Sequence, residues 1–303
     1  MALIALVVVA ATALGQLAHA RWALAPRAAR AVLSLMLYVL VPFISYVNIA
    51  HLHINAGVGA GLGFAYVELA IVGVVAWQLG TRVLHLPRPA VGGLIVCVIV
   101  VNTGYLGLPL VVALLGASQL PFAIAFDQLV SGPTLFTAGF GVGAAFGTRA
   151  DAGARERLRT FIARNPPLLA VVAGLIVPAS AAPEALVHAS HVVVLALLPL
   201  GFFVLGVNLA AEHPRGRWPL PAPDRVTVTA VGLRMVLAPV LLFALSRAFV
   251  TVPTAYLVQA AMPAGLNSLL VGHAYGLDLR LISAAVGWCT AVALLAALVI
   301  GLA

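Results

Sequence analysis

Residues 100–110 have the sequence VVNTGYLGLPL and lie in the middle of a long apolar run. A membrane helix would otherwise be expected to continue through this run. Pro109 has no N–H group, and its ring crowds the carbonyl of Tyr105, four residues earlier, so the helical hydrogen bonds open here. In hydrocarbon, backbone groups freed in this way must be satisfied by protein or by a watery cavity. We therefore predict a broken membrane helix at this position.

A second interruption lies at residues 259–268, which read QAAMPAGLNS and again combine a proline with a nearby glycine and asparagine. Pro109 and Pro263 are 154 residues apart, about half of the chain. Pro42 and Pro199 are separated by a similar distance of 157 residues. Broken helices at corresponding positions of two halves indicate the midplane binding site of a secondary transporter.

The composition excludes a water-soluble globule. The chain has 303 residues, of which 63% are hydrophobic and 8% charged, and its mean hydropathy is +1.15. It has too few polar groups to cover a soluble protein of this size. A membrane β-barrel would need alternating segments of roughly ten residues, whereas these runs are continuously apolar and about twice as long. We predict an all-α integral membrane protein.

Ten apolar runs have a length suited to crossing the membrane. They cover residues 2–18, 31–50, 57–79, 91–116, 121–146, 167–179, 185–211, 226–249, 256–275 and 281–303. The sixth run is the weakest, because on length alone it could be re-entrant. The first run is followed by arginines instead of being preceded by them, so we interpret it as a span and not as a secretory signal.

The basic residues predict the orientation of the chain. The formal charge is +8, and the sequence contains 16 arginines and no lysine. Nearly all of the arginines lie between apolar runs, which argues against a nucleic-acid-binding patch. Loops after odd-numbered runs contain 14 of the 16 arginines, and loops after even-numbered runs contain only Arg247. This asymmetry places the odd-numbered loops in the cytoplasm and both termini outside. With five spans in each half, the halves have opposite orientations and form an inverted repeat.

Four motifs resemble those of a known family. They are NTGYLGLPL at 102–110, PLGFFVLG at 199–206, AMPAGLNS at 261–268, and Asn165-Pro166-Pro167 at the start of the second half. Together they resemble the auxin efflux carrier family, which includes plant PIN proteins and bacterial organic-acid permeases. The resemblance covers the whole chain, and the first motif is the most specific.

The resemblance implies an elevator-type carrier of the bile-acid symporter architecture, with broken helices 4 and 9 crossing each other. Spans 1, 2, 6 and 7 would form a scaffold, and spans 3 to 5 and 8 to 10 a moving transport domain. The corresponding boundaries are 1–56 (scaffold), 57–147 (transport domain), 148–166 (cytoplasmic loop), 167–211 (scaffold) and 212–303 (transport domain). It also implies a multi-pass protein of the bacterial inner membrane.

The same resemblance places an anionic substrate at the crossover. Asn102, Pro109, Pro263 and Asn267 belong to the crossover motifs, and Gln128 is similar in position to a polar residue that supports the plant site. The expected substrate-binding set is Asn102, Gly104, Tyr105, Pro109, Gln128, Pro263, Gly265, Asn267 and Ser268.

Physical chemistry supports a role for the two asparagines. Half-helix N-termini concentrate unpaired N–H groups and positive dipole ends, which suit a carboxylate, and the amides of Asn102 and Asn267 can add donors. The alternative is that both asparagines only satisfy carbonyl groups freed by the prolines. Tyr105 could line the cavity or pack in the core.

Glu68 and Asp127 are candidate ion-coupling residues, because carboxylates at membrane depth are expensive to bury charged. The alternative for Asp127 is hydration near the outer end of its span. Arg234 is expected to snorkel to the cytoplasmic interface, and the alternative is that it pairs with a carboxylate. Glu68 has no basic neighbour in sequence, unlike the charged pair on the third span of plant members, which leaves the coupling ion open.

We therefore predict a secondary active transporter that moves a small organic anion, either a carboxylate or an auxin-like molecule. The alternatives are a sodium-coupled symporter and, in a different class, a membrane-embedded sensor or intramembrane hydrolase. No nucleotide-binding or hydrolase motif is present, so we expect no catalytic residues. His188 and His191 lack a third ligand, so we expect no metal and no cofactor, with coupling to protons or Na⁺. Expected partners are the anion and membrane lipid, not nucleic acid, and the architecture admits a homodimer through the scaffold helices.

Overall fold

The computed structural model describes residues 2–52, 55–148, 166–212 and 222–302. These residues are helical, with no β-strand among them and one isolated β-bridge. Six helices within these described ranges are long and apolar enough to cross a membrane: Ala25–Ile49, Ala56–Val83, Ala117–Phe146, Glu184–Val207, Arg225–Ala248 and Leu279–Ile300. The all-helical, multi-pass membrane class predicted from the sequence is therefore correct.

The remaining apolar helices are shorter, and they include both halves of the first predicted interruption. They are Leu6–Arg21, Arg88–Ile99, Thr103–Leu115 and Pro166–Ile176. The loop predicted at 148–166 lies almost wholly outside the described residues. Most of the Pro/Arg-rich connection after Glu212 is also outside them, as is Asn165.

One group of helices surrounds α12 (Glu184–Glu212) and is called the α12 group here. It comprises α12, α1 (Ala2–Arg21), α2 (Ala25–Leu35), α3 (Val41–Ile49) and α11 (Pro166–Ile176). The helix α1 packs along α12, and α11 packs along α3. Gly15 and Gly206 lie at the α1–α12 contact, where a Cβ atom on either would collide with the backbone of the other helix. Close backbone approach of this kind is typical of helix pairs in membranes.

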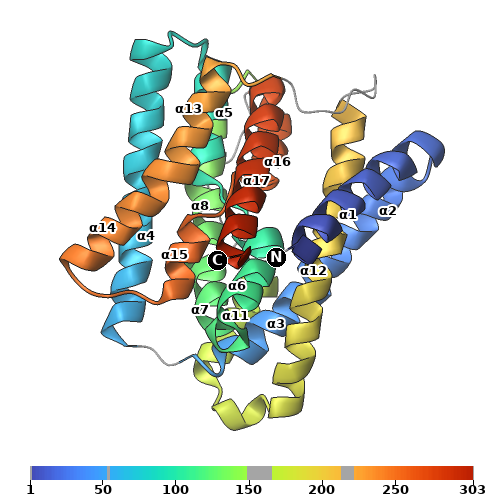
Figure 1. Ribbon diagram of the computed structural model, residues 1–303, viewed down its shortest axis with the longest axis vertical. Coiled ribbons are helices and arrows are strands. Elements are labelled where there is room, and N and C mark those ends of the chain that lie inside the picture. The colour runs from blue at the N-terminus through green and yellow to red at the C-terminus, as the bar shows by residue number, and fades with distance from the viewer. Residues whose placement is uncertain (1, 53–54, 149–165, 213–221, 303) are drawn as a thin grey trace.

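A polar contact also links the helices of the α12 group. The side-chain amide of Asn48 on α3 donates a hydrogen bond to the hydroxyl of Ser190 on α12, with an N–O distance of 2.9 Å, and both residues are buried. Hydrogen bonds between buried side chains join neighbouring helices in the membrane interior. In Figure 1, α1, α2 and α12 form one side of the molecule, with α3 below them.

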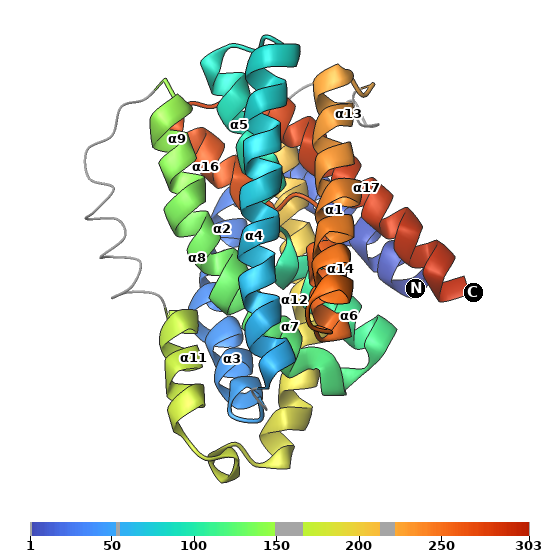
Figure 2. The same cartoon turned by 90° about the vertical axis from the view of Figure 1, so that its left-hand side faces the viewer.

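The second group contains both interrupted helices and is called the crossover group. Its elements are α4 (Ala56–Gln78), η2 (Leu79–Val83), α5 (Arg88–Ile99), η3 (Thr103–Gly107), α6 (Leu108–Leu115), η4 (Ala117–Gln119), α7 (Leu120–Phe126), η5 (Asp127–Ser131), α8 (Gly132–Thr134), η6 (Leu135–Gly139), α9 (Phe140–Phe146), α13 (Arg225–Gly232), η8 (Leu233–Leu237), α14 (Ala238–Ala248), α15 (Thr254–Ala260), α16 (Asn267–Tyr275) and α17 (Leu279–Leu302). Figure 2 shows α4 along one face, between α9 and the pair α13 and α14. The helix α17 packs against α13, α5 and α16.

Prolines explain four widened turns in these helices. The π-helical turns η1 (Met36–Leu40), η3, η5 and η8 each end two residues before a proline. These prolines are Pro42, Pro109, Pro133 and Pro239. Proline supplies no N–H and crowds the preceding turn, and a π-helical turn accommodates the resulting loss of a regular hydrogen bond. Pro42, whose spacing from Pro199 resembles that of Pro109 from Pro263, follows the first of these turns.

The start of the second span differs from the prediction. We expected Arg27 and Arg30 in a loop before residue 31, but α2 begins at Ala25, and both arginines lie exposed on that helix. Pro26 lies in the first turn of α2, where its missing N–H costs no helical hydrogen bond. Long arginine side chains can reach outward from a helix end, so charge alone did not mark the loop boundary.

Candidate functional site

The two interruptions lie against each other and exchange backbone hydrogen bonds. The N–H of Asn102 donates to the carbonyl of Pro263 over 2.9 Å, and the N–H of Gly265 donates to the carbonyl of Val100 over 2.7 Å. Val101 and Ala264 form an antiparallel β-bridge between these bonds. Each interruption thus satisfies backbone groups of the other, which is the condition for non-helical backbone at membrane depth.

Gly265 permits this close approach. A Cβ atom at this position would lie 3.0 Å from the carbonyl carbon and oxygen of Val101. That distance is tighter than nearly all contacts of a Cβ atom, so a larger residue would require the two interruptions to move apart by a few tenths of an ångström. The glycine near Pro263 therefore has a packing role in addition to the helix-breaking role predicted from sequence.

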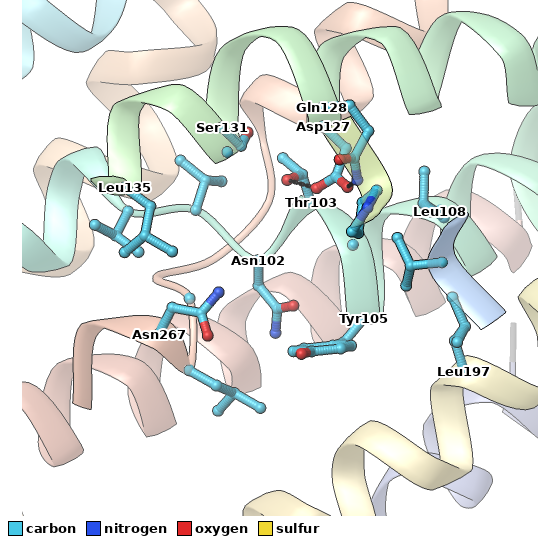
Figure 3. Close-up of a pocket in the computed structure, with 18 of the residues that line it drawn as sticks. Asn102, Thr103, Tyr105, Leu108, Asp127, Gln128, Ser131, Leu135, Leu197 and Asn267 are labelled. Carbon is cyan, nitrogen blue, oxygen red and sulfur yellow. Dashed lines mark hydrogen bonds between the residues drawn. The ribbon is translucent and has the colours of Figure 1, made fainter. Parts of the chain in front are cut away.

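A cavity of about 280 Å³ lies beside this crossing. One wall consists of the crossing itself, including Asn102, Gly265 and Asn267, and a second wall consists of the turn η5. The α12 group closes the other side through Leu33, Val41, Pro167 and Leu197. Figure 3 shows the side chains of Asn102, Asn267 and Tyr105 converging on this space, with Asp127, Gln128 and Ser131 above them.

Helix N-termini face the cavity from both interruptions. Thr103 and Gly104 line it at the start of the helix Thr103–Leu115, and Asn267 lines it at the start of α16. The first N–H groups of a helix have no acceptor within that helix, and they carry the positive end of its dipole. These two N-termini direct the positive ends of their dipoles towards the cavity, whose lining includes the carboxylate of Asp127 and no basic side chain.

Asn102 presents a free donor at this site. Its side chain is almost completely buried, with 3% of the residue exposed, and its Oδ1 accepts the N–H of Leu106 over 3.3 Å. Its Nδ2 has no hydrogen-bond partner among the described residues, and neither has the hydroxyl of Ser131. Buried polar groups are normally paired, so these two unpaired groups beside the cavity are candidates to bond to a bound molecule once a side chain turns towards it.

Asp127 lies in the cavity wall within η5. One carboxylate oxygen accepts a hydrogen bond from the hydroxyl of Thr103, and the other accepts one from Nε2 of Gln128 over 2.7 Å. Both oxygens are therefore bonded within the protein, and the side chain lines the cavity. The Thr103–Asp127 bond also fixes η5 against the first interruption.

The structure brings together most, but not all, of the residues singled out from sequence. Asn102, Gly104, Tyr105, Asp127, Gln128, Gly265 and Asn267 line the cavity. Four others do not. Pro109 is buried in α6, Pro263 contributes its carbonyl to the crossing, Ser268 is buried in α16, and Glu68 lies on α4.

Sequence reasoning missed Thr103 and Ser131 as site residues. Both lie in π-helical turns that precede a proline, and such turns are often found at functional sites. The prolines at positions 109 and 133 were therefore the available signal. Hydroxyl residues elsewhere in apolar spans can bond to their own helix, as Thr12 does, so residue type alone did not distinguish these two.

The preferred prediction for Arg234, snorkelling, was wrong, and the structure shows the alternative of pairing with a carboxylate. Its side chain is completely buried and does not reach the interface, and its Nη1 lies 3.4 Å from Oε1 of Glu68. Glu68 therefore has a basic neighbour, contrary to the reading of the sequence. Glu68 and Arg234 are 166 positions apart in the sequence, so their pairing is not visible there. Carbonyl groups at the helix interruptions also accept hydrogen bonds from the guanidinium, which offsets the cost of removing its charge from water.

Comparison with known proteins identifies two matches. Residues 158–301 match a family model described as "Membrane transport protein", a region that includes the second interruption. The chain is also 25% identical over 233 residues to an uncharacterized transporter of Methanocaldococcus jannaschii. That alignment covers 74% of this chain and 72% of the relative.

Proposed function

Because this chain is a membrane transporter of the auxin efflux carrier family, and not an enzyme, we propose that it carries a small organic anion bound in the cavity at the crossover. The observation that carries the proposal is the convergence of two helix N-termini and the free Nδ2 of Asn102 on one buried space. Unpaired N–H groups and positive dipole ends bind carboxylates.

The walls of the cavity suit an anion that also has an apolar part. Leu33, Val41 and Leu197 face the crossing from the α12 group, and Leu135 and Phe136 lie beside η5. A volume of about 280 Å³ is at the lower end of small-molecule sites. The proposed substrate class is therefore a small carboxylate, up to the size of an auxin-like molecule.

Asp127 is the proposed proton-coupling residue. A charged carboxylate in the wall opposes an anion in the cavity, since two like charges about 4 Å apart repel by roughly 4 kcal/mol at an effective dielectric constant near 20. Protonation of Asp127 removes this repulsion. Proton binding and anion binding then favour each other, which is the linkage that a proton-coupled carrier requires.

The proposed architecture is two inverted repeats of five spans that move by an elevator mechanism. The α12 group would be the scaffold, and the crossover group would be the moving transport domain. Two features support this division. The cavity lies between the groups, and the contacts within each group are more extensive than those between them.

The contact at Gly201 also suits a sliding boundary. A Cβ atom at this position of α12 would lie 3.1 Å from the ring of Tyr105, so the aromatic side chain rests on a helix surface without a side chain of its own. Small residues at helix contacts allow close approach without interlocking. We propose further that the protein lies in the bacterial inner membrane with both termini outside, and that scaffold helices mediate any homodimer.

Uptake of labelled dicarboxylates and monocarboxylates into proteoliposomes, with and without a pH or sodium gradient, tests this function. We expect saturable uptake that a pH gradient drives. The double variant N102A/N267A should lose most of the uptake while remaining folded in the membrane. Uptake by the double variant at the wild-type rate would remove the site assignment, and uptake that responds to sodium instead of protons would favour the symporter alternative.

A further inference from the structure

Each interrupted helix has a first half, α5 or α15, that ends at the crossing. The C-terminal ends of α5 and α15 meet on the side of the crossing away from the cavity. The carbonyl of Val98 belongs to the last turn of α5, and the carbonyl of Ala260 ends α15. In an unbroken helix, Val98 would accept the N–H of Asn102, but that N–H bonds to Pro263 instead. The interruptions therefore leave carbonyl groups free in the protein interior.

Arg234 donates to these carbonyl groups with all three of its nitrogen atoms. Nε donates to the carbonyl of Met262 over 3.1 Å, Nη1 donates to that of Val98 over 2.9 Å, and Nη2 donates to that of Ala260. One guanidinium thus joins α5, α15 and the second interruption. Its position in η8, the π-helical turn before Pro239, places it on the helix that packs beside both interruptions.

This cluster of acceptors requires a cation. The C-terminal ends of two helices carry negative dipole ends, and the carboxylate of Glu68 lies beside them with no exposure to solvent. Helix C-termini and unwound carbonyl groups are also the ligands that hold Na⁺ in transporters with broken helices. The guanidinium of Arg234 supplies the positive charge at the same kind of position.

We infer that Arg234 is a tethered cation, which takes the place of a dissolved sodium ion at the crossover and frees the native carrier from any need for sodium. The inference rests on the proposed function only in taking the crossover as the transport site. It assigns opposite tasks to the two sides of the crossing: helix N-termini hold the anion, and helix C-termini hold the side-chain cation.

Removal of the guanidinium should leave a site for a small cation. Glu68 would remain, and its Oε2 already has no hydrogen-bond partner among the described residues. The carbonyl groups of Val98, Ala260 and Met262 would add three oxygen ligands around the vacated space. A variant without Arg234 is therefore expected to bind sodium or free guanidinium, which the wild type does not need.

The test is thermal unfolding of purified protein in detergent, which needs no knowledge of the substrate. Wild type, R234Q and the control R247Q, which alters an exposed arginine near the end of α14, are compared in sodium chloride and choline chloride of equal ionic strength. We expect the wild type and R247Q to unfold at the same temperature in both salts. R234Q should unfold about 10 °C lower in choline and recover part of this loss in sodium or in low-millimolar guanidinium.

The double variant E68Q/R234Q shows whether the carboxylate forms part of the new site. It should be more stable than R234Q in choline, because no uncompensated charge is buried, and it should lose the response to sodium. R234K keeps a positive charge, so it should unfold above R234Q and show no response to sodium. If R234Q cannot be purified, the effect of sodium on the unfolding temperature of R234K tests the inference instead.

Three results would overturn the inference. The first is stabilisation of the wild type by sodium relative to choline. The second is R234Q unfolding at the wild-type temperature, and the third is R234K that is no more stable than R234Q or that gains stability from sodium. Each result can be obtained whether or not the protein carries a carboxylate, so failure of this inference is distinguishable from failure of the proposed function.

Discussion

Asn102 and Pro263 are joined across the two interruptions by a backbone hydrogen bond of 2.9 Å, although they are distant in sequence. The proline breaks its own helix and then provides the acceptor for the other. The side chain of Asn102 projects from the same residue into the cavity. The backbone hydrogen bond that joins the two interruptions therefore also fixes the position of the Asn102 side chain, which is proposed to bind the substrate.

Asn102→Ala should weaken substrate binding much more than it weakens the fold. The variant loses the free Nδ2 donor, and a lost hydrogen bond to a charged ligand is worth about 1.5–3 kcal/mol, which corresponds to roughly 10- to 150-fold in affinity. It also loses the side-chain acceptor for the N–H of Leu106, at a cost of about 1 kcal/mol of stability. Substrate titration and thermal unfolding of the same samples measure the two effects separately.

Asn55→Ala is the matched control for this experiment. Asn55 caps α4 by accepting the N–H of Val58 over 2.9 Å, but it is exposed and does not line the cavity. It should lose a similar amount of stability, about 1 kcal/mol, with unchanged substrate affinity. An equal loss of affinity in both variants would mean that Asn102 acts only on the fold.

Asp127→Asn should uncouple transport from the proton gradient. Asparagine keeps an oxygen that can accept the bond from Thr103, but it cannot change its charge. We expect anion exchange to continue, while a pH gradient no longer drives net uptake and substrate affinity loses its dependence on pH. Counterflow and gradient-driven uptake in the same proteoliposomes separate these activities. Net uptake that still follows the pH gradient in this variant would assign proton coupling to another group.

Gly265→Ala should destabilise the protein through the crossing. The added Cβ would lie 3.0 Å from the backbone of Val101, and forced overpacking costs about 1–3 kcal/mol. Gly141→Ala is the control, because a Cβ atom there meets nothing within 4 Å and helix propensity favours alanine. Thermal unfolding should rank Gly265→Ala below the wild type and Gly141→Ala level with or above it. The reverse order would contradict the close approach described here.

Asp224→Ala should remove a contribution to stability that depends on pH. Hydrogen bonds from Thr227, whose N–H donates to Oδ1 over 2.7 Å, lower the pKa of Asp224 at the start of α13. A lowered pKa in the folded state means that the contribution is present above the unfolded pKa of about 3.9 and is lost as pH falls through the folded value. At pH 7 the variant should lose about 1 kcal/mol.

Unfolding measured across a pH series checks this prediction. The difference between wild type and Asp224→Ala should shrink as the pH falls below the range of an ordinary aspartate. Asp224→Asn supplies the control, because asparagine is an equally good helix cap and does not titrate there. A difference that stays constant down to strongly acidic pH would show that the charge of Asp224 does not contribute.

The features predicted correctly from sequence are those that depend on local chemistry. Pro109 and Pro263 mark interruptions because proline disturbs its own helix in any context. Long apolar runs predict membrane helices for a similarly local reason. The boundary before α2 was missed by several residues, because the arginines there are compatible with both a loop and an exposed helix end.

The features missed from sequence depend on contacts between distant segments. Arg234 appeared able to snorkel because its position on one helix does not reveal the carbonyl groups of Val98 and Ala260. Thr103 was missed as a partner of Asp127 for the same reason. The division into scaffold and transport domain, and the roles of the site residues, stay predictions that the experiments above address.

The widened turns before the prolines also affect the distant parts of their helices. One extra residue in a turn offsets everything beyond it by about 100° around the helix axis, compared with a regular α-helix. In the helix Ala117–Phe146, this offset determines which side chains after η5 face the crossover and which face lipid. Gain or loss of a single proline can therefore reorient a whole half-helix, and so change which side chains face the substrate, without any other change in its sequence.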